Sequence, residues 1–248
     1  MNKTMKAYLK LESLLFFREP LQVVFSFFFP AVMFSIFASV FSGNLEGSEE
    51  YFNAYIPGYF TTIIFIVSMF MVGYQMVADK EDGVYKRLKV TPFDFHDIYR
   101  AMFVKTMIIC GVAGTEIILL AKFVFGATLT THWVQFIVAF IFGSILAVVA
   151  GFTVFALTTN TKQALTVIIL SFYPLVMLGD NTFPLEMMPK TIQVIAPIIN
   201  PLYHLNRVLR GAWVGEMFNE VVSILYVAAF IVILGLISYH YDKVLDKN

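Results

Sequence analysis

The feature of this sequence that most limits its fold is a series of long apolar stretches without charged residues. Residues 21–42 contain no charged side chain, and neither do residues 54–78. About 20 apolar residues in an α-helix are enough to cross the hydrocarbon core of a membrane. Of the 248 residues, 59% are hydrophobic and 14% are charged, whereas soluble domains have roughly 45–50% and 25%. We therefore expect lipid to be the main solvent, and a single all-α integral membrane domain over residues 1–248.

Four further apolar stretches bring the predicted number of transmembrane helices to six. They cover residues 98–121, 133–158, 163–179 and 221–241. The first of these four begins with Arg100 and Lys105, whose long side chains we expect to reach back to the membrane surface. Residues 1–20 intersperse lysines with leucines and aromatic residues, a pattern typical of an amphipathic helix at the membrane interface. A plain cytoplasmic tail is the alternative for these residues.

Two features inside the predicted spans suggest more than membrane anchoring. Gly143, Ala147 and Gly151 recur at four-residue intervals, and small residues at that spacing let membrane helices approach closely. They can pack within the chain or against a second copy. Glu116 is the one carboxyl deep in a predicted span, and such a group is a functional candidate by default. It can face a substrate path, take up a proton or pair near the interface.

Residues 180–215 are too interrupted to span the membrane and too apolar to form a free loop. They contain four prolines, Pro184, Pro189, Pro197 and Pro201. We expect a re-entrant helical hairpin between the fifth and sixth spans, buried against protein. Arg207 and Arg210 lie three residues apart and so share one helix face. We expect them to pair with Glu186 or Glu216 or to meet lipid headgroups, and an anionic substrate is the alternative.

The distribution of basic residues predicts how the chain is oriented, because cytoplasmic loops carry an excess of lysine and arginine. With six spans, four of the 17 basic residues fall on the side away from the termini: Lys122, Lys190, Arg207 and Arg210. The other 13 fall on the side of the termini. Both termini and residues 79–97 are therefore predicted to be cytoplasmic, and the 180–215 hairpin extracellular.

Several functional classes have no support in the sequence. It contains no G-x-x-x-x-G-K-[ST] phosphate loop, no H-E-x-x-H and no G-x-S-x-G, so we expect neither an ATPase site nor enzymatic activity in this chain. The four histidines are scattered without the spacing of a metal site, and the single cysteine, Cys110, excludes an intrachain disulfide. A net charge of zero gives no indication of nucleic acid. We expect no catalytic residue, metal or cofactor in the chain itself.

The densest run of charge is the loop at 79–97, which begins D-K-E-D-G-V-Y-K-R-L-K-V-T-P. Val84 and Leu88 are four residues apart and can form an apolar ridge, with the basic residues between them pointing elsewhere and Pro92 stopping the helix. Acidic residues just before the helix suit its dipole. This pattern predicts a short amphipathic helix at the cytoplasmic mouth, able to dock into a groove on a partner. A solvated connector that only obeys the charge rule is the alternative.

The run Asp79-Lys80-Glu81-x-Gly83-x-x-Lys86-Arg87-Leu88-x-Val90-Thr91-Pro92 resembles the coupling helix of the type-2 permease subunits of ATP-binding cassette (ABC) exporters. The hairpin is similar to that family's F-P-L-E-x-M-P, N-P-L-T-Y and L-R-G motifs, here Phe183-Pro184-Leu185-Glu186-x-Met188-Pro189, Asn200-Pro201-Leu202-Tyr203-His204 and Leu209-Arg210-Gly211. The similarity covers nearly the whole chain in the right order. Three departures affect details: Asp79-Lys80 replaces a more usual Glu-Arg, Tyr85 a small or apolar residue, and His204 a small residue.

The resemblance implies a bacterial plasma-membrane permease subunit. It would pair with a second copy or a homologous permease chain and with two separate ATPase subunits, which would hold ATP and magnesium. The coupling residues it implies are Asp79, Glu81, Gly83, Lys86, Arg87, Leu88, Thr91 and Pro92. The gate or hairpin residues are Pro184, Glu186, Pro189, Asn200, Pro201, Arg207 and Arg210, for which packing alone is the alternative.

The implied cargo is a hydrophobic or amphipathic small molecule, lipid or peptide, such as an antibiotic. A rival hypothesis from another class is a membrane immunity or sensor protein that transports nothing and recruits a cytoplasmic partner. A membrane-embedded enzyme, with Glu116 as its one candidate group, is the third hypothesis.

Overall fold

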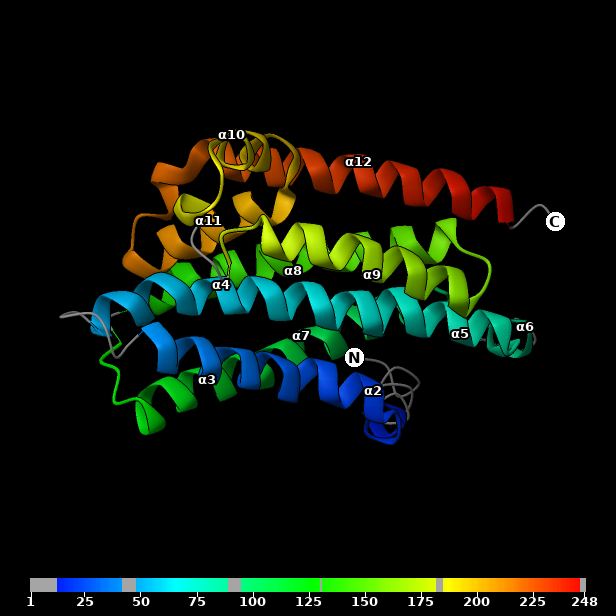
Figure 1. Ribbon diagram of the computed structural model, residues 1–248. Helices are drawn as coiled ribbons and strands as arrows, with labels where there is room; N and C mark the ends of the chain where they lie inside the picture. The colour runs from blue at the N-terminus through cyan, green and yellow to red at the C-terminus, as the bar shows by residue number, and fades with distance from the viewer. Residues whose placement is uncertain (1–12, 42–47, 89–94, 130, 182–184, 246–248) are drawn as a thin grey trace.

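The computed structural model describes residues 13–41, 48–88, 95–129, 131–181 and 185–245. Every regular element in these ranges is a helix, and the long helices run side by side (Figure 1). Four described stretches are long and apolar enough to cross a membrane: Phe52–Glu81, Ile98–Val124, Trp133–Leu157 and Met217–Tyr241. Shorter apolar helices cover Val24–Val40, Thr161–Met177 and Lys190–Ile199. The predicted all-α membrane class is confirmed.

The first long helical stretch contains a π-helical turn next to a proline. It consists of α2 (Pro20–Val23), the π turn η1 (Val24–Phe28) and α3 (Phe29–Phe41). Pro30 lacks an N–H group and would clash with the carbonyl four residues earlier in a regular α-helix. The wider π turn immediately before it gives the ring room without breaking the helix. Residues 1–12 of the predicted surface helix lie outside the described residues.

The second stretch forms the centre of the bundle (Figure 1). It consists of α4 (Ser48–Ser68), the π turn η3 (Met69–Tyr74) and α5 (Gln75–Glu81). Of the residues in its most apolar segment, 89% are buried, and Ile63, Ile64 and Met71 are fully enclosed. A helix that is hydrophobic all round belongs in a core. The helices that pack on this stretch are α3, α7, α8, α9 and α11.

The helices from the middle of the chain pack around the central stretch. Its elements are α6 (Val84–Leu88), α7 (Phe95–Leu119), the π turn η4 (Leu120–Val124), α8 (Trp133–Leu157) and α9 (Thr161–Met177). On α7, Arg100 is exposed but Lys105 is only 3% exposed, so the expectation that Lys105 lies at the membrane surface was wrong. The packed chain around it encloses its side chain.

The small residues of α8 let other parts of the same chain come close. A Cβ on Gly143 would lie 2.5 Å from Leu205 Cδ1 of α11. A Cβ on Gly151 would lie 2.8 Å from the Cβ of Val72 in η3. Ala147, between them, is also buried. The stripe therefore packs within the chain, the first of the two roles considered for it.

The C-terminal part contains a pair of short helices followed by the last long one. Its elements are η5 (Leu185–Met187), α10 (Lys190–Ile199), α11 (Pro201–Val214), η6 (Met217–Glu220) and α12 (Val221–Leu245). Asn200 begins α11: its side chain accepts a hydrogen bond from Leu202 N at 2.9 Å, and Pro201 occupies the first helical position. Gly215, with φ of 87°, ends α11 in the left-handed conformation.

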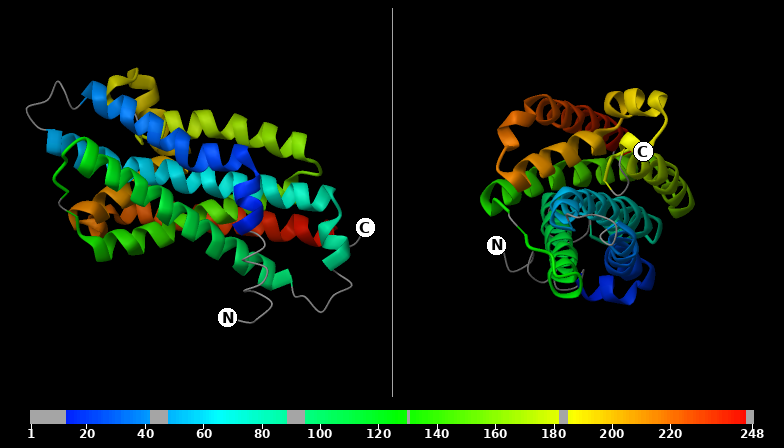
Figure 2. Two further views of the ribbon diagram at one scale, coloured as in Figure 1. Left: turned by 90° about the horizontal axis from the view of Figure 1, so that it is seen from below. Right: turned by 60° about the vertical axis from the view of Figure 1, so that its left-hand side comes forward.

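The bundle has two distinct ends (Figures 1 and 2). The coupling end carries α5, α6, the turn at 158–161 between α8 and α9, and the last turns of α12. The hairpin end carries α10, α11 and η6. Between the ends, α12 packs on α8 but leaves most of its apolar surface outside. Only 11% of the residues in its most apolar segment are buried. Such a surface is stable only in contact with hydrocarbon or with another membrane helix.

Candidate functional site

At the coupling end, Glu81 links the central stretch to α9. Its Oε2 accepts a hydrogen bond from the backbone N–H of Thr161 at 2.9 Å. Thr161 is the first residue of α9, and Asn160 caps that helix by accepting from Gln163 N at 2.9 Å. The first N–H groups of a helix have no partner within the helix and carry a partial positive charge. Glu81 therefore supplies both the acceptor and the negative charge that this helix start favours.

Lys80 and Tyr85 hold α5 and α6 against α8. Lys80 Nζ donates to the carbonyl oxygen of Thr158 at 3.5 Å and lies 5.0 Å from the centre of the Phe155 ring. Tyr85, on α6, is buried and meets the same Phe155 ring edge-on, with centroids 5.9 Å apart. Gly83, with φ of 71°, makes the sharp turn between the two helices, a conformation that costs a residue with a Cβ. These two helices, residues 75–88, form what we call the coupling unit, and it is therefore anchored at several points.

The remaining predicted coupling residues are placed as follows. Asp79 accepts a hydrogen bond from Gln75 Nε2 at 3.0 Å, and Gln75 accepts one from Gln22 Nε2 at 2.6 Å, which joins the first helical stretch to α5. Lys86 and Arg87 are exposed on α6, as a docking surface requires. Leu88 is the last residue of α6, and Thr91 and Pro92 lie outside the described residues.

An aromatic cavity of about 260 Å³ lies where the first two π turns, η1 and η3, meet α9, with the exposed Tyr173 at its rim. The rings of Phe25 in η1 and Phe70 in η3 stack there with centroids 5.1 Å apart. The whole lining is apolar or aromatic: Phe25, Phe29, Ile66, Phe70, Leu165, Ile168, Ile169, Phe172 and Tyr173. Extra residues in π turns reorient side chains and are frequent at functional sites. This cavity can receive an apolar or aromatic group but offers little to a charged one.

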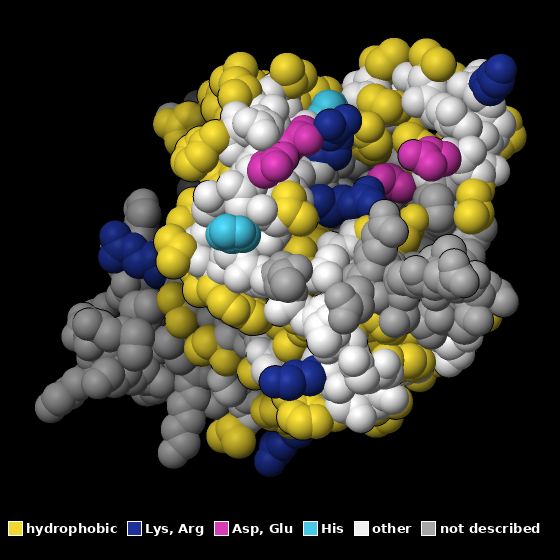
Figure 3. Space-filling model, turned by 90° about the vertical axis from the view of Figure 1, so that its left-hand side faces the viewer, with side chains coloured by type: hydrophobic (Ala, Val, Ile, Leu, Met, Phe, Trp, Pro, Cys, Tyr) yellow, Lys and Arg dark blue, Asp and Glu magenta, His cyan; other side chains and the backbone are white. Residues whose placement is uncertain are grey.

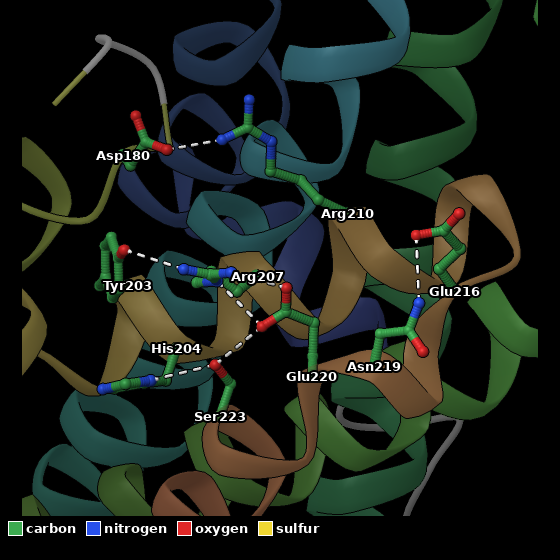
Figure 4. A network of polar contacts seen from close by, with 9 residues as sticks. All are labelled: Asp180, Tyr203, His204, Arg207, Arg210, Glu216, Asn219, Glu220 and Ser223. Carbon is green, nitrogen blue, oxygen red and sulfur yellow. Dashed lines mark hydrogen bonds and ion pairs between the residues drawn. The ribbon is translucent and has the colours of Figure 1, made fainter. Parts of the chain in front are cut away.

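At the hairpin end, two arginines of α11 form ion pairs (Figure 4). Arg207 binds Glu220 of η6 with two parallel bonds, Nε to Oε2 at 2.9 Å and Nη2 to Oε1 at 2.8 Å. Arg210 Nη1 lies 2.5 Å from Asp180 Oδ2. The expected partners, Glu186 and Glu216, were therefore wrong. The reversal of the chain at Gly215 places Glu220 beside Arg207, and the end of α9 brings Asp180 to Arg210. The bidentate carboxylate raises the pKa of Arg207.

His204 lies buried behind Arg207 and ties three helices together (Figure 4). Its Nε2 is 2.7 Å from the carbonyl oxygen of Pro197 in α10, so this nitrogen carries the proton and donates. Its Nδ1 lies 3.2 Å from Ser223 Oγ of α12, whose hydroxyl donates to Glu220 Oε2 at 3.2 Å. Burial lowers the pKa of His204 below its usual value, because the charged form is poorly solvated there. The neutral ring therefore acts as a structural connector.

The other hairpin residues have backbone roles. Pro189 precedes α10, and its carbonyl oxygen accepts from Ile192 N at 2.9 Å. Asn200 Nδ2 donates to the carbonyl oxygen of Leu175 in α9 at 2.8 Å. Glu186 lies in η5 and is exposed, whereas Pro184 is outside the described residues.

Glu116 lies on the outer side of α7, partly exposed in a surface groove of about 750 Å³. The groove is otherwise lined mainly by apolar side chains such as Ile108 and Phe123. No hydrogen bond or ion pair joins Glu116 to another described residue. No group of three or more histidines, cysteines or carboxylates in the described ranges could hold a metal ion. Glu116 is therefore not joined to the polar networks at either end.

A family model described as ABC-2 type transporter matches residues 4–214. The chain belongs to the ABC-2 type transporter family. The matched range contains both the coupling unit and the α10–α11 hairpin. An ABC-2 permease domain typically lacks an ATPase site and associates with ABC ATPase subunits, so this chain is a multi-pass ABC transporter permease. No curated protein sequence matches the chain significantly.

Several residues of this ABC-2 permease escaped the sequence analysis. Phe155, Thr158 and Thr161 contact the coupling unit but lie 70 to 80 positions after the residues they meet. Asp180 and Glu220 are the arginine partners. One signal was available: the polar turn after residue 157 follows a cytoplasmic end of a predicted span, and so had to lie near the 79–97 loop. Which atoms meet there depends on the helix rotations, which only packing decides.

Proposed function

We propose that the chain is the permease subunit of an ATP-driven exporter and that α5 and α6 receive movement from a separate ATPase subunit. Two ATPase subunits would dock beneath two permease chains, which are identical or homologous. The topology we propose has six spans at 21–42, 54–78, 98–121, 133–158, 163–179 and 221–241, with cytoplasmic termini in a bacterial plasma membrane. The end of α12 and the α6 helix lie at the same end of the bundle, which supports this arrangement (Figure 1).

The observation that carries the proposal is the bond from Thr161 N to Glu81. It connects the coupling unit to the start of α9, and α9 supplies Leu165, Ile168 and Phe172 to the aromatic cavity. A push on α6 is therefore passed to the cavity wall through a short, hydrogen-bonded path. For ATP to drive this change, it must bind one of the two conformations more tightly than the other.

The chemistry of the cavity supports an apolar or amphipathic cargo. Its volume of about 260 Å³ suits an aromatic or aliphatic portion of a larger molecule, since whole small-molecule sites occupy about 300–1,000 Å³. The cargo we propose is a hydrophobic or amphipathic small molecule, lipid or peptide, such as an antibiotic. Transport runs outward in this proposal because exporters of this family share the coupling and hairpin motifs.

Docking is tested by co-purification in mild detergent with the ATPase encoded nearest to this chain. Wild type should retain the ATPase in a fixed ratio, and a variant with Lys86, Arg87 and Leu88 all replaced by alanine should lose it. If even wild type retains no ATPase, the chain has no energy source, and the non-transporting sensor or immunity hypothesis replaces the exporter.

Coupling is tested with a matched pair at Thr161. Thr161→Pro removes the N–H that Glu81 binds, yet proline is favourable at the first position of a helix. Thr161→Ala keeps that N–H. The readout is an environment-sensitive dye on Tyr173→Cys, at the exposed rim of the cavity, in a chain that also carries Cys110→Ala. ATP should change the dye emission in wild type and Thr161→Ala but much less in Thr161→Pro, with ATPase binding retained. Equal responses in both variants would refute the path.

A further inference from the structure

The hairpin end contains a second, polar cavity of about 560 Å³ that the proposed transport path does not use. Figure 3 looks onto this end and shows arginine and acidic side chains gathered around a hollow. Its walls come from the first turns of α4, the end of the α9 segment, η5, α11 and η6. A hollow of this size is typical of small-molecule sites. It differs from the aromatic cavity because charges of both signs line it.

The two arginines present unused hydrogen-bond donors to this cavity. A guanidinium has five N–H groups in a planar fork. Arg210 gives one bond to Asp180, and its guanidinium carbon lies 5.6 Å from the centre of the Tyr55 ring. Arg207 gives two bonds to Glu220 and one to Tyr203. Both forks are therefore held in place by protein contacts while N–H groups remain available. Such a fork matches the oxygens of a phosphate or carboxylate.

Two carboxylates on the same cavity are outside the ion pairs. Glu186 lines the cavity from η5, and no described residue bonds to its carboxylate. Glu216 lines it from the start of η6, and its one side-chain partner among the described residues is the neutral amide of Asn219 at 3.3 Å. With Asp180 and Glu220 neutralised by the arginines, these two groups leave an excess of negative charge. An ammonium group beside either carboxylate would reduce this excess.

Apolar side chains at the rim favour a lipid over a soluble zwitterion. Val214, which lines the cavity, is 53% exposed, and Phe218 in η6 is 72% exposed. Phe218 lies between the cavity residues Glu216 and Glu220 in sequence. On the neighbouring α10, Val194 and Ile198 are 65% and 64% exposed. A polar hollow flanked by outward apolar residues at the end of a membrane bundle matches a headgroup followed by acyl chains.

We propose that this cavity binds the headgroup of an ethanolamine phospholipid, with its phosphate on the remaining N–H groups of Arg207 and Arg210 and its ammonium on one of the two carboxylates outside the ion pairs, Glu186 or Glu216. The site is independent of the ATPase, so it is tested on the chain alone. Purified wild type is mixed with equal amounts of phosphatidylethanolamine, phosphatidylcholine and phosphatidylglycerol of identical acyl chains, and the retained lipid is counted by native mass spectrometry.

The wild-type chain should prefer phosphatidylethanolamine over phosphatidylcholine by about tenfold, because methylation removes the ammonium N–H donors and one charge-assisted hydrogen bond is worth about that factor. It should also disfavour phosphatidylglycerol, which has no ammonium. Equal retention of the three lipids overturns the proposal. If soluble glycerophosphoethanolamine displaces the phospholipid at equal concentration, the assignment to a lipid headgroup is overturned.

Two variants separate this site from general lipid contact. The double substitution Glu186→Gln with Glu216→Gln leaves both ion pairs intact and should abolish the preference for ethanolamine over choline. Glu116→Gln removes a carboxyl elsewhere on the outside of the bundle, on α7, and should leave the preference unchanged. A preference that survives the double substitution, in a protein with wild-type thermal stability, refutes the assigned ammonium site.

Discussion

Replacing Gly151 with alanine should destabilise the protein, whereas the same replacement at Gly111 should not. A Cβ at Gly151 would lie 2.8 Å from Val72 Cβ and 2.9 Å from the carbonyl oxygen of Ser68. Ordinary contact begins at 3.4 Å, so α8 and η3 must separate by several tenths of an ångström. A Cβ at Gly111, in α7, would meet nothing within 4 Å. The two substitutions are chemically identical and differ only in what surrounds them.

The expected size of the effect follows from two opposing contributions. Alanine improves helix propensity by about 1 kcal/mol at either site. Forcing an extra methyl group into a packed core costs about 1–3 kcal/mol, which applies only at Gly151. The two variants should therefore differ by about 1–3 kcal/mol in the free energy of unfolding. For a chain of this size that is a difference of about 2–12 °C in Tm.

The assay is thermal unfolding of both variants in the same detergent, followed by circular dichroism, with the oligomeric state checked by size-exclusion chromatography. Equal stability of the two variants would refute the close approach of α8 to η3. If Gly151→Ala instead changes the oligomeric state and leaves Tm unaltered, the small-residue stripe serves a second copy and not the interior.

Three further predictions concern the two ends of the bundle. Folding lowers the pKa of His204, so the stability that its neutral ring contributes is complete above the unfolded pKa of about 6.5 and is lost as pH falls below that value. Tm should therefore drop more between pH 7.5 and 5.5 in wild type than in His204→Gln. Tyr85→Ala removes an aromatic contact worth about 0.5–1.5 kcal/mol and should speed tryptic cleavage after the exposed Lys86 and Arg87. Asn200→Ala should cost about 1 kcal/mol through the lost cap, and Asn200→Asp should not restore the stability, because its buried carboxylate keeps the cap acceptor but sets an oxygen against the Leu175 carbonyl; Tm measures both.

The coupling unit illustrates how far local pattern reaches. The 79–92 run predicted a short helix with exposed basic residues, and α6 with Lys86 and Arg87 has this form. The predicted ridge of Val84 and Leu88 is different: the buried residue of α6 is Tyr85, while Val84 is half-buried and the side chain of Leu88 lies outside what the structure describes. A helix of five residues is too short for its own periodicity to select a buried face. The aromatic ring of Phe155 on α8 makes that selection.

The hairpin end shows the same limit for charges. The spacing of Arg207 and Arg210 established a shared helix face, but several carboxylates lay within reach in sequence. The partner of each arginine depends on how the chain reverses at Gly215 and how it turns at Asp180, after the end of α9. Neither turn has a charge pattern of its own, so the sequence could not rank the candidates.

The sequence by itself determined the solvent of this protein, its helical class and its family, because these follow from local properties: the length of apolar runs, the positions of charges between them and short contiguous motifs. Only the tertiary structure decided the pairs formed across the bundle, among them Glu81 with the start of α9, Tyr85 with Phe155, and the glycines of α8 with η3 and α11. These pairs depend on the rotation and depth of each helix. In a chain whose helices are apolar on nearly every side, local periodicity leaves rotation undetermined, and close packing against the neighbours determines it.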